Sequence, residues 1–79
     1  MRTSKVYVIS EIGQFSDTVV AVCQGKDTVL NSVLNTLASQ YGARDYYEDL
    51  VDDGKEITFI TSSGDIEIKI TQSTYYSIY

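Results

Sequence analysis

Two stretches near the start of the chain are rich in β-branched residues and predict a β-hairpin. Residues 5–10 read KVYVIS and residues 18–24 read TVVAVCQ, and the GQFSD between them contains turn-forming residues. Apolar side chains fall on both faces of each stretch. Val6 and Tyr7, for example, are consecutive and so point to opposite faces of a strand. We therefore expect both strands to lie centrally in a sheet, or to have their second face covered.

From residue 29 the hydrophobic period changes from two to 3.6, which indicates an amphipathic helix. Asp27 or Thr28 can cap the start of this helix, and Gly42 can end it in the left-handed conformation. The apolar stripe runs along three turns: Val29, Leu30, Val33, Leu34, Leu37, Ala38 and Tyr41.

The outer face of this helix is polar but carries no charge, which is unusual in an acidic protein. It is either a neutral solvated face or a second contact surface. Its residues are Asn31, Ser32, Asn35, Thr36, Ser39 and Gln40.

The segment EITFITSSGDIEIKITQ, residues 56–72, predicts two strands joined by a Ser-Ser-Gly turn. Its second half alternates as a half-buried antiparallel strand does, with isoleucines at 66, 68 and 70 pointing inward. The outward residues are Asp65, Glu67, Lys69 and Thr71. The tail STYYSIY either adds a further short strand or stays mobile.

Residues 45–54, DYYEDLVDDG, hold five of the eleven carboxylates of the chain. At 100° per residue, Tyr46, Tyr47, Leu50 and Val51 gather on one side of a helix and the carboxylates on the other, which predicts a two-turn amphipathic helix closed by Gly54. Like charges at i,i+4 weaken such a helix, so local stability does not explain these residues.

These elements predict an α+β fold for residues 1–79, formed as a single small domain. Its core is an antiparallel sheet of four to five strands with one long helix packed on one face. The expected order is β-β-α-α-β-β, with room for a further strand at the end.

The composition removes most catalytic and metal chemistry. There is no histidine, Cys23 is the only cysteine, and no phosphate-binding glycine loop occurs. An EF-hand loop with Gly54 at its sixth position would place Val51 and Ile60 among the calcium ligands. We therefore expect no enzyme activity, no metal site and no cofactor.

The apolar runs are too short for a signal peptide or a bilayer span, which predicts a cytoplasmic protein with no membrane partner. The net charge of −5 and pI of about 4.3 argue against direct nucleic-acid binding, which needs lysine and arginine. The acidic stretch instead predicts a surface that binds a basic protein, or else a solvated face with core tyrosines. The candidate contact residues are Asp45, Tyr46, Glu48, Asp49, Asp52 and Asp53.

Residues 5–41, KVYVISEIGQFSDTVVAVCQGKDTVLNSVLNTLASQY, followed by the acidic DYYEDLVDD, resemble the small anti-CRISPR proteins of phages and other mobile elements. The resemblance implies an inhibitor that works in the host cytoplasm. It would bind a CRISPR effector over the basic surface meant for guide or target nucleic acid. The acidic residues from Asp45 to Asp53 would make the contact.

The same stretch is also similar to antitoxins of the HicB kind and, more loosely, to the ubiquitin-type β-grasp. An acidic antitoxin neutralising a basic toxin is therefore one alternative. Another is a structural homodimerisation or adaptor module, in which the uncharged helix face or an exposed edge strand makes the contact and the acidic residues serve solubility.

Overall fold

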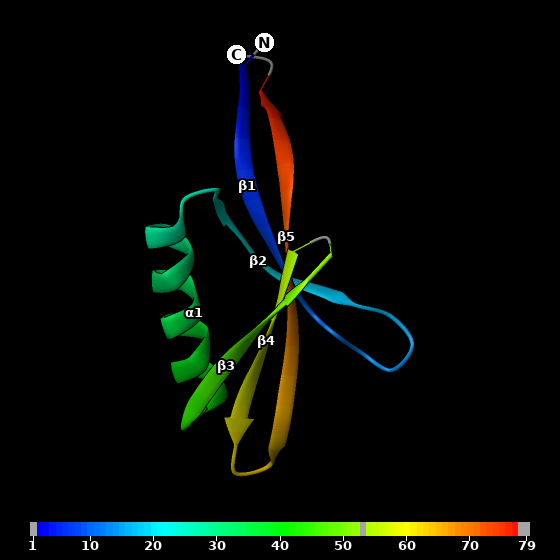
Figure 1. The fold of residues 1–79 in the computed structure, drawn as a ribbon, viewed down its shortest axis with the longest axis vertical. Helices are drawn as coiled ribbons and strands as arrows, with labels where there is room; N and C mark the ends of the chain where they lie inside the picture. Colours follow the sequence, from blue (N-terminus) through cyan, green and yellow to red (C-terminus); the bar gives the residue numbers. More distant parts are fainter. Residues whose placement is uncertain (1, 53, 78–79) are drawn as a thin grey trace.

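The computed structural model describes residues 2–52 and 54–77, which form a small α+β fold of five strands and one helix (Figure 1). All neighbouring strands run antiparallel in one sheet of order β2-β1-β5-β4-β3. The elements are β1 (Arg2–Glu11), β2 (Thr18–Gln24), α1 (Asp27–Tyr41), β3 (Asp45–Val51), β4 (Gly54–Thr61) and β5 (Gly64–Ser77). The predicted fold class, with one antiparallel sheet and one long helix, is confirmed.

The first and last strands pair in the middle of the sheet. Arg2 lies opposite Ser77 at one end of this ladder, and Glu11 lies opposite Ile68 at the other. The far part of the β1–β5 ribbon extends beyond the helix and carries Arg2 and Ser77, the first and last described residues (Figure 1). The tail therefore prolongs β5 as far as Ser77 and is not a separate strand, while residues 78 and 79 lie outside the described part.

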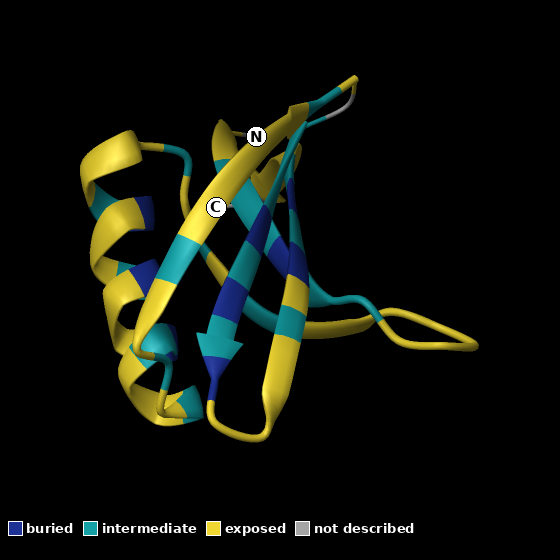
Figure 2. Ribbon diagram, turned by 60° about the horizontal axis from the view of Figure 1, so that its bottom comes forward, coloured by how far each residue is buried: buried dark blue, intermediate teal, exposed yellow. Residues whose placement is uncertain are grey.

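Helix α1 covers one face of the sheet with its leucine stripe (Figure 2). Leu30 and Leu34 have no exposed surface, and Leu37 is also buried. The sheet residues buried with them are Ile9, Ile57, Phe59, Ile68 and Ile70. The 3.6-residue period thus predicted the correct buried face, and the inward isoleucines of β5 are confirmed.

The end of α1 agrees with the sequence prediction, but its start does not. Gly42 adopts φ 68° in the left-handed region, and its N–H donates to the Ser39 carbonyl. At the start, Lys26 occupies the cap position without a side-chain bond. Asp27 is the first helical residue and its carboxylate accepts the hydroxyl of Tyr7 at 2.9 Å, so it fastens the helix to β1 instead of capping it.

The acidic stretch is the strand β3 and not the predicted short helix, so the expected element order was wrong at this point. Seven residues are too few for a stable isolated helix, and β4 offers a complete antiparallel partner from Ile60, opposite Asp45, to Gly54, opposite Val51. Pairing with β4 and the high β propensity of the two tyrosines therefore determine the local structure.

Strand β2 is an edge of the sheet, although the sequence predicted a central or doubly covered position. Its apolar residues on the face away from α1 stay open: Val19 is 58% exposed and Val22 is 59% exposed. Its neighbour β1 does lie inside the sheet, between β2 and β5.

Within the described residues, no helix has the length and hydrophobicity needed to span a bilayer.

Candidate functional site: an acidic face of the sheet

Side chains alternate along β3 and divide the predicted site between the two faces of the sheet. Tyr46 points towards α1, where it packs with the core, so Glu48 lies on that same face. Asp45, Tyr47 and Asp49 therefore lie on the opposite face, which α1 does not cover. Most of β3 is exposed (Figure 2).

Strands β4 and β5 add three more carboxylates to the uncovered face. Glu56 lies opposite Asp49, and Asp65 and Glu67 lie on β5 at positions that alternate with the buried isoleucines. We call this surface the acidic face. Its five described carboxylates are Asp45, Asp49, Glu56, Asp65 and Glu67.

The register arranges the acidic face as three rows of three residues across β3, β4 and β5. The first row is Asp45, Ile60 and Asp65; the second is Tyr47, Thr58 and Glu67; the third is Asp49, Glu56 and Lys69. Tyr47 lies in the middle of the β3 column and is 50% exposed.

The spacing of these charges follows from sheet geometry. Residues on one face of a strand recur about every 6.5 to 7 Å, and neighbouring strands lie about 4.8 Å apart. Asp49 and Glu56 are like charges directly opposite each other, an arrangement that weakens strand pairing. Lys69 lies on the other side of Glu56 and offsets part of this repulsion. The stability of the sheet therefore does not explain why Asp49 is acidic.

The acidic face offers separated charges and not a chelating cluster. Across residues 2–52 and 54–77, no three histidine, cysteine, aspartate or glutamate side chains are placed to share one metal ion. An array of carboxylates around a half-exposed tyrosine suits contact with the lysines and arginines of another macromolecule.

Two of the six residues predicted as the partner-binding site belong to the acidic face, namely Asp45 and Asp49. Asp52 is exposed just beyond the end of β3, in the turn before β4. Asp53 lies outside the described residues. Tyr46 and Glu48 are on the wrong side of the sheet for a site shared with Asp45.

Tyr46 and Glu48 have structural contacts on the helix side. The Tyr46 ring packs edge to face on Phe59 with 5.5 Å between ring centroids, and its hydroxyl donates to Asn35 Oδ1 at 3.3 Å. Glu48 lies 3.9 Å from Lys55 Nζ, an ion pair that is partly exposed and contributes little to stability.

The sequence prediction missed Tyr47, Glu56, Asp65 and Glu67 as members of one surface with Asp45 and Asp49. Part of the signal was present, because Asp65 and Glu67 were predicted to point outward from their strand. The sequence did not show that residues 45–51 form strand β3, which only β4 separates from β5 in the same sheet.

The comparisons with known proteins do not identify a family. No protein family matches the chain, and the searches of curated proteins and of solved structures gave no significant match.

Proposed function

We propose that the protein is a non-enzymatic inhibitor that binds the basic, nucleic-acid-handling surface of a larger protein through its acidic face. The observation that carries this proposal is the placement of five carboxylates around Tyr47 on an uncovered sheet face. The resemblance of residues 5–41 and of the acidic stretch to anti-CRISPR proteins makes a CRISPR effector the first partner to test.

The spacing of the acidic face supports mimicry of a nucleic-acid backbone. A nucleic-acid strand carries one phosphate about every 3.4 Å along the duplex axis, and basic proteins place lysine and arginine to meet these charges. On the acidic face, Asp49 and Glu56 are about 5 Å apart across neighbouring strands, and Asp65 and Glu67 are about 7 Å apart along β5. Asp45 lies about 13 Å from Asp49 along β3. The array therefore offers acceptors to several such side chains at once. Charge-assisted hydrogen bonds of this kind are among the stronger polar contacts in proteins.

Tyr47 supports the same proposal, because charge alone gives rate and orientation more than affinity. A half-exposed tyrosine within a polar rim can bury its ring against a partner while its hydroxyl keeps a hydrogen bond. Tyrosine is one of the residue types that most often dominate binding energy at protein interfaces.

Protection of an exposed edge is the simplest structural explanation for acidic residues on β3. Charged side chains on an edge strand prevent it from pairing with other chains. This explanation covers Asp45 and Asp49 but not Glu56, because β4 is paired on both sides, with β3 and with β5. The extension of the charge across three strands favours a binding surface.

Binding to a purified CRISPR effector tests the proposal, with two triple variants of equal net charge. The site variant D45N/D49N/E67Q neutralises the acidic face, while the control variant E11Q/D17N/E48Q neutralises three carboxylates outside it. Since each charge-assisted hydrogen bond contributes about 1.5 to 3 kcal/mol, we expect the site variant to lose affinity by about a hundredfold or more. The control variant should bind nearly as wild type does.

A salt series completes the test. Affinity of the wild-type protein should fall steeply with ionic strength, and the site variant should show a weaker dependence. Equal binding by the two triple variants, both folded, would exclude the acidic face as the contact surface.

A further inference from the structure

The surface formed by β2 and α1 carries charge only where Lys26 and Asp27 join the two elements, and we call it the uncharged side. The chain has 17 charged residues, 11 acidic and 6 basic, yet none occurs in residues 18–25 or 28–43. These two segments contain β2 and nearly all of α1, which contact each other. A short turn leads from the end of β2 into the start of α1 (Figure 1). The cores of protein interfaces are depleted of charge in the same way.

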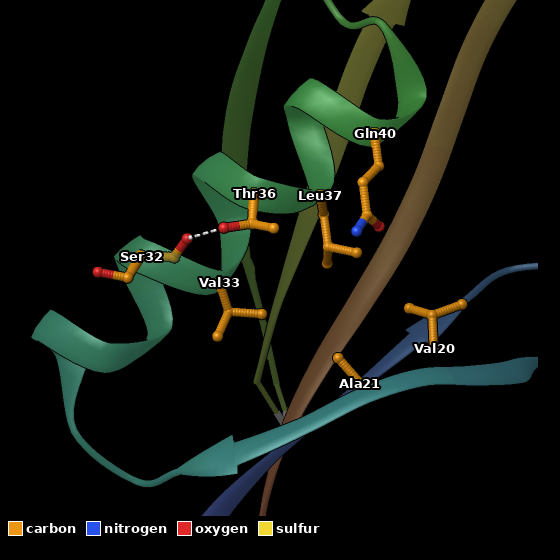
Figure 3. Close-up of a pocket in the computed structure, with 7 residues that line it drawn as sticks. All are labelled: Val20, Ala21, Ser32, Val33, Thr36, Leu37 and Gln40. Atoms are coloured by element: carbon orange, nitrogen blue, oxygen red, sulfur yellow. Dashed lines mark hydrogen bonds between the residues drawn. The ribbon is translucent and has the colours of Figure 1, made fainter.

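A groove of about 300 Å³ lies between β2 and α1 on this uncharged side. Its apolar lining comes from Val20 and Ala21 of β2 and from Val33 and Leu37 of α1, whose side chains face one another across it (Figure 3). The polar lining residues of α1 are Ser32, Thr36 and Gln40. The groove is therefore suited to apolar and neutral side chains.

The outer edge of β2 has backbone groups that no described strand pairs. The Gly25 N–H donates to the Lys5 carbonyl, and backbone bonding alternates along an antiparallel strand. Val22 and Gln24 therefore direct their N–H and C=O groups away from β1, and the Gln24 C=O accepts the N–H of Lys26 at 2.8 Å. Val20 interrupts the ladder, since Ala21 pairs with Ile9 but Val19 pairs with the next residue of β1. The regular part of the free edge is thus residues 21–24.

We infer that the protein forms a two-fold symmetric dimer through antiparallel pairing of β2 with β2 of a second copy. The distribution of charge favours a second copy of the chain as the partner at this edge. A chain with a net charge of −5 repels its own copy at most of its surface, and the other edge strand, β3, is acidic. On the uncharged side a second copy meets no cluster of like charge, since Lys26 and Asp27 at its end have opposite signs, whereas a charged partner would gain nothing there.

The outward-facing backbone groups also determine the register of the two strands. Pairing Val22 with Gln24 of the second copy uses both outward-facing residues and stays within the regular part of β2. The Gln24 carbonyl, which already accepts the Lys26 N–H, then accepts a second hydrogen bond with its other lone pair. The symmetry axis then passes between Cys23 and Cys23 of the second copy. A register centred on Val22 would instead place Gln24 opposite the irregular residue Val20. The first register joins the two sheets into one, with both helices on the same face and their uncharged outer residues at the seam.

Cross-linking tests both the dimer and its register, because Cys23 is the only cysteine in the chain. Directly opposite residues of a non-hydrogen-bonded antiparallel pair have Cα atoms about 4.5 Å apart, within the range that a disulfide spans. Copper-phenanthroline, with oxygen as the final electron acceptor, should convert the two thiols to a disulfide and give a covalent dimer on non-reducing gels. The variant T18C/C23S, with its cysteine beyond the irregular residue, should not cross-link.

Two lysine substitutions on the same strand supply the matched pair for solution measurements. Val19 and Val22 are almost equally exposed on the same face, so V19K and V22K should fold equally well. V22K places a charge at the proposed seam and should weaken self-association by about tenfold or more in sedimentation equilibrium. V19K lies outside the paired segment and should associate nearly as wild type does.

A wild-type protein that stays monomeric at the highest concentration reached would overturn the inference. This outcome includes the case in which the β2 edge binds a strand of another protein instead of a second copy. A dimer that resists cross-linking through Cys23 and is unaffected by V22K would overturn the β2 pairing. The dimer and the proposed inhibition fail independently, since V22K leaves the acidic face intact and D45N/D49N/E67Q leaves β2 intact.

Discussion

The ring of Tyr46 lies edge to face against Phe59, with centroids 5.5 Å apart and an angle of 61° between the ring planes. The two residues are directly opposite each other in β3 and β4. Phe59 is completely buried and also contacts Tyr41 at the end of α1, so the aromatic contact connects the edge strand to the core. This arrangement assigns different roles to two consecutive tyrosines.

Replacement of Tyr46 by alanine should destabilise the protein, because it removes this ring contact and the hydrogen bond to Asn35. For a half-buried aromatic side chain we expect a loss of about 2 to 3 kcal/mol in the free energy of unfolding, measured by urea denaturation. The matched variant Y47A should change stability by about 0.5 kcal/mol or less but should weaken partner binding. Equal destabilisation by the two variants would contradict the placement of β3.

Leu34→Ala should destabilise the core directly. Leu34 has no exposed surface and packs in the centre of the leucine stripe of α1. Truncation of a fully buried leucine costs about 2 to 5 kcal/mol, which approaches the whole stability of a domain of this size. Circular dichroism during urea titration measures the loss, and Asn31→Ala on the exposed face of the same helix serves as the control, with little change expected.

Stability should fall at alkaline pH. The hydrogen bond from Tyr7 to Asp27 raises the pKa of Tyr7, and burial raises the pKa of Tyr41 and of the Cys23 thiol. A raised pKa in the folded state means that the folded protein holds the proton more tightly than the unfolded chain does. The associated stability is therefore complete below the ordinary values of 9.0 for cysteine and 10.0 for tyrosine, and it is lost as the pH rises above them.

Urea midpoints at neutral pH and at steps above pH 9 measure this loss. The variant Y7F should be less stable than wild type at neutral pH and should show a smaller decrease on going to alkaline pH. A midpoint that stays constant through this range for the wild-type protein would contradict the proton linkage.

Gly54→Ala should be destabilising because a β-carbon at this position would collide with the carbonyl oxygen of Ile70 on the neighbouring strand. The backbone fixes the position of the β-carbon, and the carbonyl oxygen belongs to the backbone of β5, so a side-chain movement cannot relieve the clash. We expect a loss above about 1 kcal/mol in the free energy of unfolding, measured by urea denaturation. Gly42→Asn is the comparison: its position is open and left-handed, a conformation that asparagine tolerates. A milder effect at Gly54 than at Gly42 would argue against the close β4–β5 approach.

The sequence predicted correctly those elements whose local pattern fits only one type of secondary structure. The leucine stripe of α1 fits only a helix, and the alternation in residues 65–71 fits only a strand with one buried face. The acidic stretch fits both periods, because its apolar residues come as the adjacent pairs Tyr46–Tyr47 and Leu50–Val51. A helix would place all four on one side, whereas the strand divides each pair between the two faces. The choice depends on Phe59, a tertiary partner that no local pattern shows.

The candidate site was predicted less completely than the fold for the same reason. Asp45 and Asp49 were identified from their clustering in sequence, but their neighbours on the acidic face come from β4 and β5. The residues that share a surface depend on which strands are adjacent and on their register. A shift of one residue in the register moves every side chain of a strand to the opposite face.

The pairing of β1 with β5 has a consequence for how the protein reaches its native state. The β1–β2 hairpin and the β3–β4–β5 meander can each form from residues that are near in sequence, but the ladder that joins them unites the two ends of the described chain. Closing so long a loop costs entropy before the contacts that reward it are made. Folding should therefore be limited by the docking of two preformed halves, and the complete sheet can assemble on the ribosome only after β5 has emerged.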